Sequence, residues 1–309
     1  MTKGRGEISG ERLRQIAQEY DAICILGPTA SGKSRFAAEL AGRFSPVAEI
    51  LSADSRQVYR QMDIGTGKDL QEYGSIPYHL IDIADAGEKY NLFRYQRDFS
   101  AAYANIRQRG VTPIICGGSG LYIEAVTRGY ALQDVAPDSK LRSSLERESL
   151  ESLKEMLRQL KERRGSKLHN NTDVESKKRA IRAIEIEKYA AEHAFKPSET
   201  LILPEKVYFI GIDVEREERN RRIDERLQRR LKEGMVEEVK RLLESGLSAE
   251  QLLYYGLEYK FITLYLTGEM GYSEMVERLG IAIHQFAKRQ MTWFRGMERK
   301  GVEIEWIKI

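Results

Sequence analysis

Short runs of apolar residues alternate with longer amphipathic segments through most of the chain. Four runs are almost continuously apolar, which is the pattern of strands buried on both faces, and they span residues 22–26, 47–53, 111–116 and 207–213. Helical spacing of apolar residues begins after the first run, near Lys33, and recurs over residues 92–109. Strands that alternate with helices in this way predict an α/β fold with a doubly wound parallel sheet.

The pattern changes in the middle of the chain. Between about residues 133 and 203 the apolar residues are sparse and recur at helical spacing, and no strand pattern occurs. We therefore expect a first part of the core over residues 1–132, a helical insertion domain over 133–203, and a return to the core with C-terminal helices over 204–309. The segment before the first strand has the composition of a polar lead-in.

Composition and charge restrict the function only loosely. The 309 residues are 41% hydrophobic and 31% charged with a formal net charge of +3, so bulk charge by itself does not indicate nucleic-acid binding. Cys24 and Cys116 lie in apolar runs and are expected to be core residues, and the four histidines do not have the spacing of a metal site. No segment resembles a signal peptide or a membrane span, so we expect a cytoplasmic protein that contacts no membrane.

A phosphate-binding motif follows the first predicted strand. The segment GPTASGKS fits the pattern G-x-x-x-x-G-K-[ST], with a strand before it and a helix after it. In such a loop the backbone N–H groups and the helix N-terminus face phosphate oxygens, the lysine adds a positive charge, and the serine hydroxyl can bind Mg²⁺. The residues expected to hold phosphate are Gly27, Pro28, Thr29, Ala30, Ser31, Gly32, Lys33 and Ser34, with Ser34 as the magnesium ligand.

Polar residues follow two further predicted strands. Asp54 comes directly after residues 47–53, and Ser119 follows residues 111–116 after a pair of glycines. Ligands of open parallel sheets bind beyond the carboxyl ends of the strands, so both side chains are expected near the phosphate loop. There Asp54 could act as a general base on an acceptor group, and the alternative is an aspartate that only caps a turn or a helix.

Four segments together resemble the tRNA dimethylallyltransferase, or IPP transferase, family. They are GPTASGKS, LSADSRQVYRQMDIGTGK, CGGSGLY and AKRQMTWFR, and the resemblance extends over nearly the whole chain. It implies a P-loop kinase-like fold and transfer of a dimethylallyl group from dimethylallyl diphosphate to the exocyclic amine of the adenosine 3′ of the anticodon. The phosphate loop would hold the diphosphate of this donor together with Mg²⁺, and the partner would be the tRNA anticodon stem-loop.

The resemblance also implies roles for individual residues. Asp54 matches the general base, Ser119 stands where a threonine is usual, and Arg222 matches an arginine that supports the leaving diphosphate. A monomer without an obligate protein partner is expected. The positions that match tRNA contacts, including the pocket for the extruded adenine, are Asp54, Ser55, Arg56, Gln57, Ser119, Arg142, Lys178, Arg179, Arg182, Lys288, Arg289, Gln290, Trp293 and Arg295.

The chain departs from the family pattern in three segments that would face the tRNA. Ser176 stands near the place of a common aspartate, and YGLEYK (residues 255–260) replaces a glycine-tyrosine motif. Ile283 and His284 stand where a threonine and a basic residue are frequent. These departures indicate a variant of the family whose contacts with RNA differ in detail.

Other interpretations of the same residues stay open. Without the resemblance, the run of residues 161–188, net basic but interleaved with glutamates, also fits a solvated helix face, and residues 287–295 fit a helix that packs its aromatic side chains into the core. The chain could prenylate a free adenine nucleotide or phosphorylate a small molecule, although neither reaction needs the helical insertion. It could also be an RNA-binding protein with a relict phosphate loop, against which the intact Lys33 and Asp54 argue.

Overall fold

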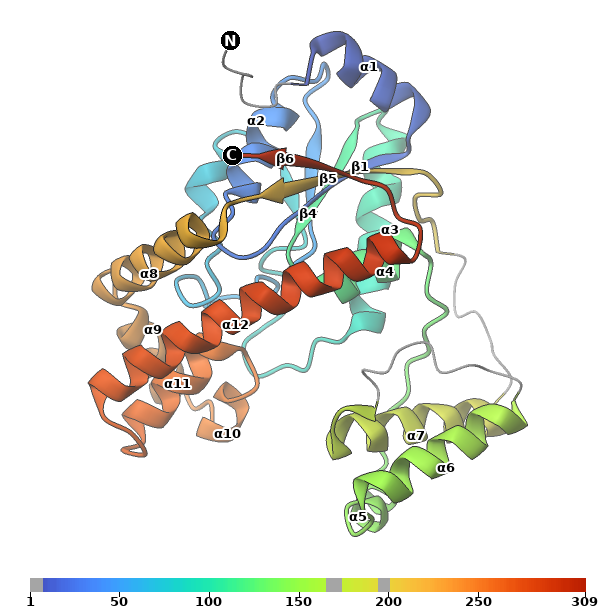
Figure 1. Cartoon of the computed structure of the whole chain (residues 1–309), viewed down its shortest axis with the longest axis vertical. Coiled ribbons are helices and arrows are strands. Elements are labelled where there is room, and N and C mark those ends of the chain that lie inside the picture. The colour runs from blue at the N-terminus through green and yellow to red at the C-terminus, as the bar shows by residue number, and fades with distance from the viewer. Residues whose placement is uncertain (1–7, 165–173, 194–200) are drawn as a thin grey trace. The chain divides into compact units, whose positions relative to one another are not determined.

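The computed structural model describes residues 8–164, 174–193 and 201–309 (Figure 1). The chain forms two compact units. Unit 1 comprises Met1–Tyr130 and Leu201–Ile309, and unit 2 comprises Ala131–Thr200. The hydrophobic pattern placed the two boundaries after residues 132 and 203.

Unit 1 is built on one parallel sheet of six strands in the order β3-β2-β4-β1-β5-β6. Every neighbouring pair is parallel, so the carboxyl ends of the strands lie at one edge, which confirms the predicted fold class. The final stretch VEIEWIKI pairs with the fourth predicted run and becomes an edge strand. In chain order the strands are β1 (Ala22–Leu26), β2 (Glu49–Ser52), β3 (Tyr78–His79), β4 (Pro113–Gly117), β5 (Val207–Asp213) and β6 (Ile304–Lys308).

Helices cover both faces of this sheet (Figure 1). Alternate residues of β1 explain the continuous apolar pattern, because Ile23 and Ile25 enter one buried cluster while Cys24 and Leu26 enter the other. The helices of unit 1 are α1 (Gly10–Glu19), α2 (Lys33–Ala41), the 3₁₀ turn η1 (Leu70–Tyr73), α3 (Leu92–Gln108), α4 (Gly120–Thr127), α8 (Arg216–Lys232), α9 (Met235–Glu244), α10 (Ala249–Leu252), α11 (Leu257–Leu266) and α12 (Tyr272–Arg299).

Residues 10–19 of the polar lead-in form helix α1, an element that the hydrophobic pattern did not predict. Ser9 caps this helix by accepting a hydrogen bond from the backbone N–H of Arg12 at 3.1 Å. Leu13 and Ile16 are buried in the cluster that also contains α2. Two apolar side chains three residues apart are enough to attach a short, otherwise polar helix to the sheet.

Unit 2 is helical, and its described part contains α5 (Ser139–Leu145), α6 (Leu150–Arg163) and α7 (Lys177–Glu192). Leucines of α6 and aliphatic residues of α7 share one buried cluster. Ser176 caps α7 by accepting from the N–H of Arg179 at 3.4 Å, so the serine that departs from the family pattern keeps the hydrogen bond that an aspartate would make. Within the described residues, no helix is long and apolar enough to cross a bilayer.

Candidate active site

The phosphate motif forms the turn between β1 and α2. Ala30 (φ 59°) and Gly32 (φ 81°) adopt left-handed conformations, which curl the backbone ahead of the first turn of α2. Gly32 is the N-cap and provides no side-chain cap, so the N–H groups of the first turn stay free to face an anion. The ammonium group of Lys33 lies 3.4 Å from the carbonyl oxygen of Pro28. Burial lowers the pKa of Lys33, while nearby Cys116 and Asp54 oppose this shift.

Gln290 of α12 connects the phosphate loop to the loop after β4. Its Oε1 accepts from the N–H of Thr29 at 2.8 Å, and its Nε2 donates to the carbonyl of Gly118 at 2.9 Å. A Cβ atom on Gly118 would lie 2.4 Å from this amide nitrogen, and one on Gly120 would lie 2.2 Å from the indole ring of Trp293. The glycines of CGGSG are therefore required where α12 approaches the site. The sequence had assigned both α12 residues to tRNA, whereas the structure commits the buried amide of Gln290 to these two loops.

Replacing Gln290 by alanine should destabilise the protein, because it removes the partner of the half-buried N–H of Thr29 and of the buried carbonyl of Gly118. We expect the free energy of unfolding to fall by about 2–6 kcal/mol, because each of the two groups contributes about 1–3 kcal/mol. Urea unfolding of Gln290→Ala measures this change. Gln285→Ala is the matched control, since Gln285 is an exposed glutamine on the same helix. Equal stability of the two variants would contradict the connecting role.

The residues that follow β2 and β4 meet at the same edge of the sheet. The N–H of Ser55 donates to Oγ of Ser119 at 3.1 Å, and the two serine hydroxyls lie 3.4 Å apart. Asp54 accepts from the N–H of Arg56 through Oδ1 at 2.9 Å. Asp54 thus caps a turn, as the alternative interpretation expected, and it also lies close enough to Lys33 to affect the pKa of that lysine.

Gln57 and Arg56 form the next part of the site. The Gln57 side chain is buried, accepts from the Ser52 hydroxyl at 3.2 Å and donates to the carbonyl of Gly67 at 3.0 Å. The Arg56 guanidinium lies 5.2 Å from the ring centre of the exposed Tyr254. This pairing gives the site an aromatic surface with a cation beside it, which suits contact with a nucleobase.

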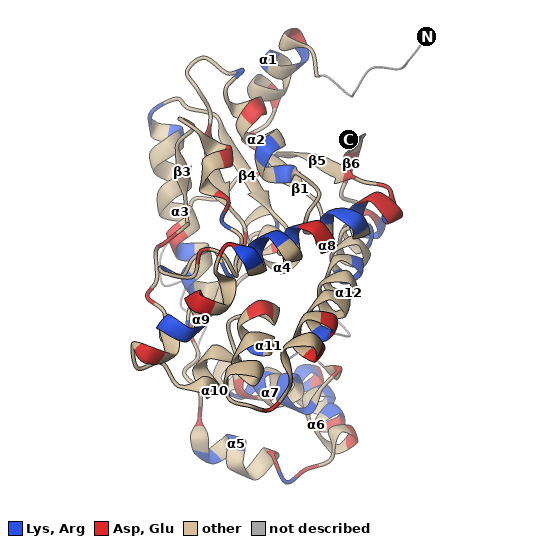
Figure 2. Ribbon diagram, turned by 90° about the vertical axis from the view of Figure 1, so that its left-hand side faces the viewer, with Lys and Arg blue, Asp and Glu red and all other residues tan. Residues whose placement is uncertain are grey.

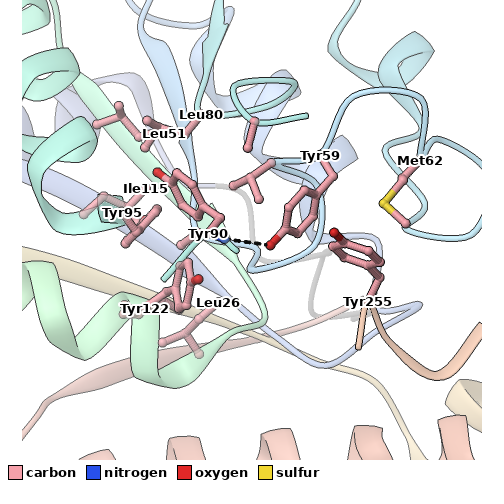
Figure 3. Close-up of a cluster of buried hydrophobic side chains, with 14 of the residues drawn as sticks. Leu26, Leu51, Tyr59, Met62, Leu80, Tyr90, Tyr95, Ile115, Tyr122 and Tyr255 are labelled. Atoms are coloured by element: carbon pink, nitrogen blue, oxygen red, sulfur yellow. Dashed lines mark hydrogen bonds between the residues drawn. The ribbon is translucent and has the colours of Figure 1, made fainter. Parts of the chain in front are cut away.

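Several tyrosines belong to one buried cluster of unit 1 (Figure 3). The ring of Tyr255 packs edge-on against that of Tyr59 at 4.7 Å, and the Tyr59 hydroxyl accepts from the N–H of Tyr90 at 3.1 Å. Burial raises the pKa of Tyr59 to about 12 and also raises that of Tyr122. These phenols stay protonated at neutral pH and form a neutral wall next to the charged groups of the site.

Arg226 of α8 is the arginine that the structure brings to the phosphate loop. Its guanidinium donates to Oγ1 of Thr29 at 3.3 Å and to the carbonyl of Gly67 at 3.3 Å. The sequence assigned the diphosphate to Arg222, one turn earlier, but Nε of Arg222 donates to Glu218 at 2.7 Å. The sequence missed Arg226, although its spacing from Arg222 places both on one face of the helix.

Asp69 holds this arginine from the other side. Its carboxylate forms ion pairs with Arg226 and, at 3.3 Å, with Arg230. Burial alone would raise the pKa of Asp69, but the two arginines outweigh it and lower that pKa. Burial lowers the pKa of Arg230 to about 10. Asp69 is therefore ionised at neutral pH and orients the Arg226 guanidinium toward the loop.

Comparison with known proteins identifies the family of the chain. The sequence model of the IPP transferase family matches residues 57–297. The chain belongs to the IPP transferase family. Among its relatives, tRNA dimethylallyltransferase 1 of Parabacteroides distasonis is 55% identical over 294 residues, covering 94% of this chain and 93% of the relative. tRNA dimethylallyltransferase 2 of Porphyromonas gingivalis is 56% identical over 289 residues, covering 92% and 93%.

Solved structures of such enzymes share the fold. The tRNA isopentenylpyrophosphate transferase of Bacillus halodurans has a TM-score of 0.66 and 32% identity, covering 93% of this chain and 89% of that one. A eukaryotic dimethylallyltransferase that acts on tRNA has a TM-score of 0.71 at 24% identity, covering 92% and 73%, and this likeness concerns the fold alone.

The residues of this IPP transferase fit a magnesium ion in a limited way. Mg²⁺ on a phosphorylated substrate needs only one or two protein oxygens, the rest coming from phosphate and water. The Ser34 hydroxyl stands in the first turn of α2, within hydrogen-bonding range of the buried Tyr73 hydroxyl. The described residues contain no group of three or more histidine, cysteine, aspartate or glutamate side chains that could hold a metal alone.

All three unit 2 arginines that the family pattern assigns to tRNA already have partners. Arg142 forms a two-pronged ion pair with the buried Glu185 at 2.7 and 2.8 Å, and Arg182 contacts the same carboxylate at 3.1 Å. Arg179 pairs with Glu175 at 2.5 Å. Lys178 is exposed. These pairs reduce the net charge available to RNA phosphates and also hold α5 to α7.

Basic residues of α12 are exposed; Figure 2 marks lysine and arginine positions in blue along the ribbon. Lys288, Arg289 and Arg295 are exposed, and the Arg289 guanidinium lies 5.9 Å from the ring centre of Phe286, which is also exposed. Within the described residues none of the three makes an ion pair with a carboxylate. His284, at a position where the family often has a basic residue, pairs with Asp224 at 2.7 Å.

Proposed function

We propose that this chain transfers the dimethylallyl group of dimethylallyl diphosphate to the exocyclic amine of the adenosine 3′ of the anticodon in tRNA. The product would be N6-dimethylallyladenosine. The observation that carries the proposal is identity of 55% to a tRNA dimethylallyltransferase across 94% of the chain. The placement of Asp54 and the phosphate loop at one sheet edge supports it.

The phosphate loop and Arg226 would bind the donor's diphosphate. As the allylic carbon–oxygen bond breaks, negative charge grows on the leaving diphosphate. Lys33, Arg226 and the N–H groups at the start of α2 can stabilise this charge. Mg²⁺ held by Ser34 and the phosphates would add a further positive charge. Burial lowers the pKa of Lys33, and an incoming anion would oppose this shift because it favours the charged ammonium group.

Asp54 would receive the proton of the acceptor. The exocyclic nitrogen of adenine forms the new bond to the allylic carbon and loses one proton, which the free Oδ2 of Asp54 can accept while Oδ1 keeps the turn. A base stacked in an RNA loop cannot reach an edge of this kind, so the adenine has to be extruded at a cost of about a few kcal/mol. Arg56 and Tyr254 offer the surface against which it could stack.

Acceptor choice separates this function from its main rivals. Purified protein is incubated with labelled dimethylallyl diphosphate and either tRNA or AMP. We expect label in tRNA only. Label in AMP alone would identify a free-nucleotide prenyltransferase, and label in neither would favour a kinase or a relict RNA-binding protein.

The exposed basic residues of α12 predict how RNA binding depends on salt. Each phosphate contact contributes roughly 0.7–0.9 to the slope of log affinity against log salt. The double variant Lys288→Ala, Arg289→Ala should weaken tRNA binding and reduce that slope by about 1–2. A double variant at Lys240 and Arg241 of α9 removes the same charge from another helix. Equal slopes for both double variants would show that α12 does not touch RNA phosphate.

A further inference from the structure

The segment MDIGTGK is part of the family pattern, but none of its chemical groups takes part in the proposed reaction. Its last residue, Lys68, is 1% exposed. The Lys68 ammonium donates to the carbonyl of Tyr59 at 2.8 Å and to Asp63 at 2.5 Å, and it also pairs with Asp82. A buried cation is stable only when its donors are satisfied in this way. We term residues 63–69 the 63–69 loop. The buried Lys68 ammonium thus stabilises the conformation of this loop.

Helix α9 holds the same loop from outside. Both carboxylate oxygens of the buried Glu238 accept hydrogen bonds from backbone N–H groups, at 2.8 Å from Asp63, 2.8 Å from Ile64 and 3.0 Å from Gly65. The Tyr259 hydroxyl donates to this carboxylate as well, at 2.7 Å. Charge-assisted hydrogen bonds to a buried carboxylate are among the stronger ones in proteins. The loop is therefore held rigidly by groups that touch neither proposed substrate.

One carbonyl of this rigid loop contacts both sides of the site. The Gly67 carbonyl accepts from Nε2 of Gln57, beside the proposed adenine pocket, at 3.0 Å. It also accepts from Arg226 at 3.3 Å, and that guanidinium reaches Thr29 of the phosphate loop. The two donors come from segments 169 residues apart in the chain, at positions 57 and 226.

We propose that Gly67 is a positioning residue: its carbonyl sets the distance between the acceptor-side Gln57 and the donor-side Arg226. Transfer between two bound substrates depends on the alignment of the reacting atoms, and displacement by about 1 Å can reduce the rate roughly 100-fold. The inference rests on the proposed function, since it presupposes a donor at the phosphate loop and an acceptor near Gln57. It assigns a role to the 63–69 loop that requires no contact with either substrate.

A side chain at position 67 would clash with two arginine side chains. Gly67 has φ +64°, and a Cβ atom there would lie 1.7 Å from the Arg230 guanidinium and 2.5 Å from that of Arg226. Gly67→Ala should therefore displace both arginines. Gly110 is the matched control, because its φ is +70° and nothing lies within 4 Å of its Cβ position. Alanine at either position must adopt a positive φ, but only Gly67→Ala displaces Arg226.

We expect Gly67→Ala to lose roughly 100-fold in kcat/KM for dimethylallyl diphosphate, with unchanged affinity for tRNA. Gly110→Ala should transfer the prenyl group at the wild-type rate, and its Tm should fall less than that of Gly67→Ala, because only Gly67→Ala displaces the buried Arg230. If Gly67→Ala matches Gly110→Ala in rate, Gly67 has no positioning role.

A double-mutant cycle decides the matter if Gly67→Ala does not fold. Gln57→Ala, Arg226→Ala and their combination are compared in kcat/KM. If one carbonyl positions both side chains, the double variant should lose less kcat/KM than the product of the two single losses predicts. Gln57→Ala with Arg229→Ala is the control pair, because Arg229 is an exposed arginine of α8 paired with Glu233. Independent, multiplicative losses in the first pair would refute the inference.

The outcome that would contradict the proposed function differs from the outcome that would contradict only the role of Gly67. Wild-type protein that transfers no label to tRNA removes the proposed function and the inference with it. Active wild-type protein with multiplicative losses, and with Gly67→Ala equal to its control, removes only the inference.

Discussion

Asp54→Asn is expected to bind tRNA as the wild type does and to transfer the prenyl group at least ~100-fold more slowly. Asparagine has the same shape, and its carbonyl oxygen can still accept from the N–H of Arg56, so the turn after β2 should be retained. An amide cannot accept the proton that the exocyclic amine loses. Single-turnover transfer and filter binding measure the two quantities separately.

This substitution distinguishes the two interpretations of Asp54. If the aspartate only caps the turn, asparagine serves equally well and the rate should not change. Asp85→Asn is the control, since Asp85 is an exposed aspartate paired with Arg60. An unchanged rate for Asp54→Asn would remove Asp54 from the proton transfer while leaving the diphosphate site intact.

The fold could be predicted from the sequence because its signals are local. In β1 every residue is buried, and its side chains alternate between two clusters, which produces an apolar run that no amphipathic helix would show. The phosphate motif and Asp54 lie directly after such runs, so their place at the sheet edge followed from the parallel topology. Helix α1 was missed because only Leu13 and Ile16 are buried in it, a weak periodic signal over ten residues.

The missed parts of the site depend on contacts between distant segments. The residues around Gln290 have the composition of an RNA-binding helix. Only the approach of α12 to Thr29 and Gly118 shows that the Gln290 amide faces inward. α8 contains several arginines with similar local sequence. Which of them reaches the phosphate loop depends on how α8 packs against a loop almost 200 positions earlier, and that information is not in the local pattern.

Arg226→Ala is expected to lower kcat/KM for dimethylallyl diphosphate by roughly 100–1,000-fold, because it removes a donor aimed at the leaving diphosphate. Arg226→Lys should recover only part of the loss, since an ammonium group cannot contact Thr29, Gly67 and Asp69 together. The affinity for tRNA should not change. Urea unfolding shows whether the fold is retained, because Asp69 keeps Arg230 as a partner.

Arg222→Ala provides the decisive comparison, because the family pattern points to Arg222 and the geometry points to Arg226. The Arg222 guanidinium is paired with Glu218, so its removal should affect the donor KM much less than the loss of Arg226. The reverse order, a large loss at Arg222 and a small one at Arg226, would mean that a bound diphosphate draws Arg222 away from Glu218. In that case Arg226 would serve only to hold the 63–69 loop against α8.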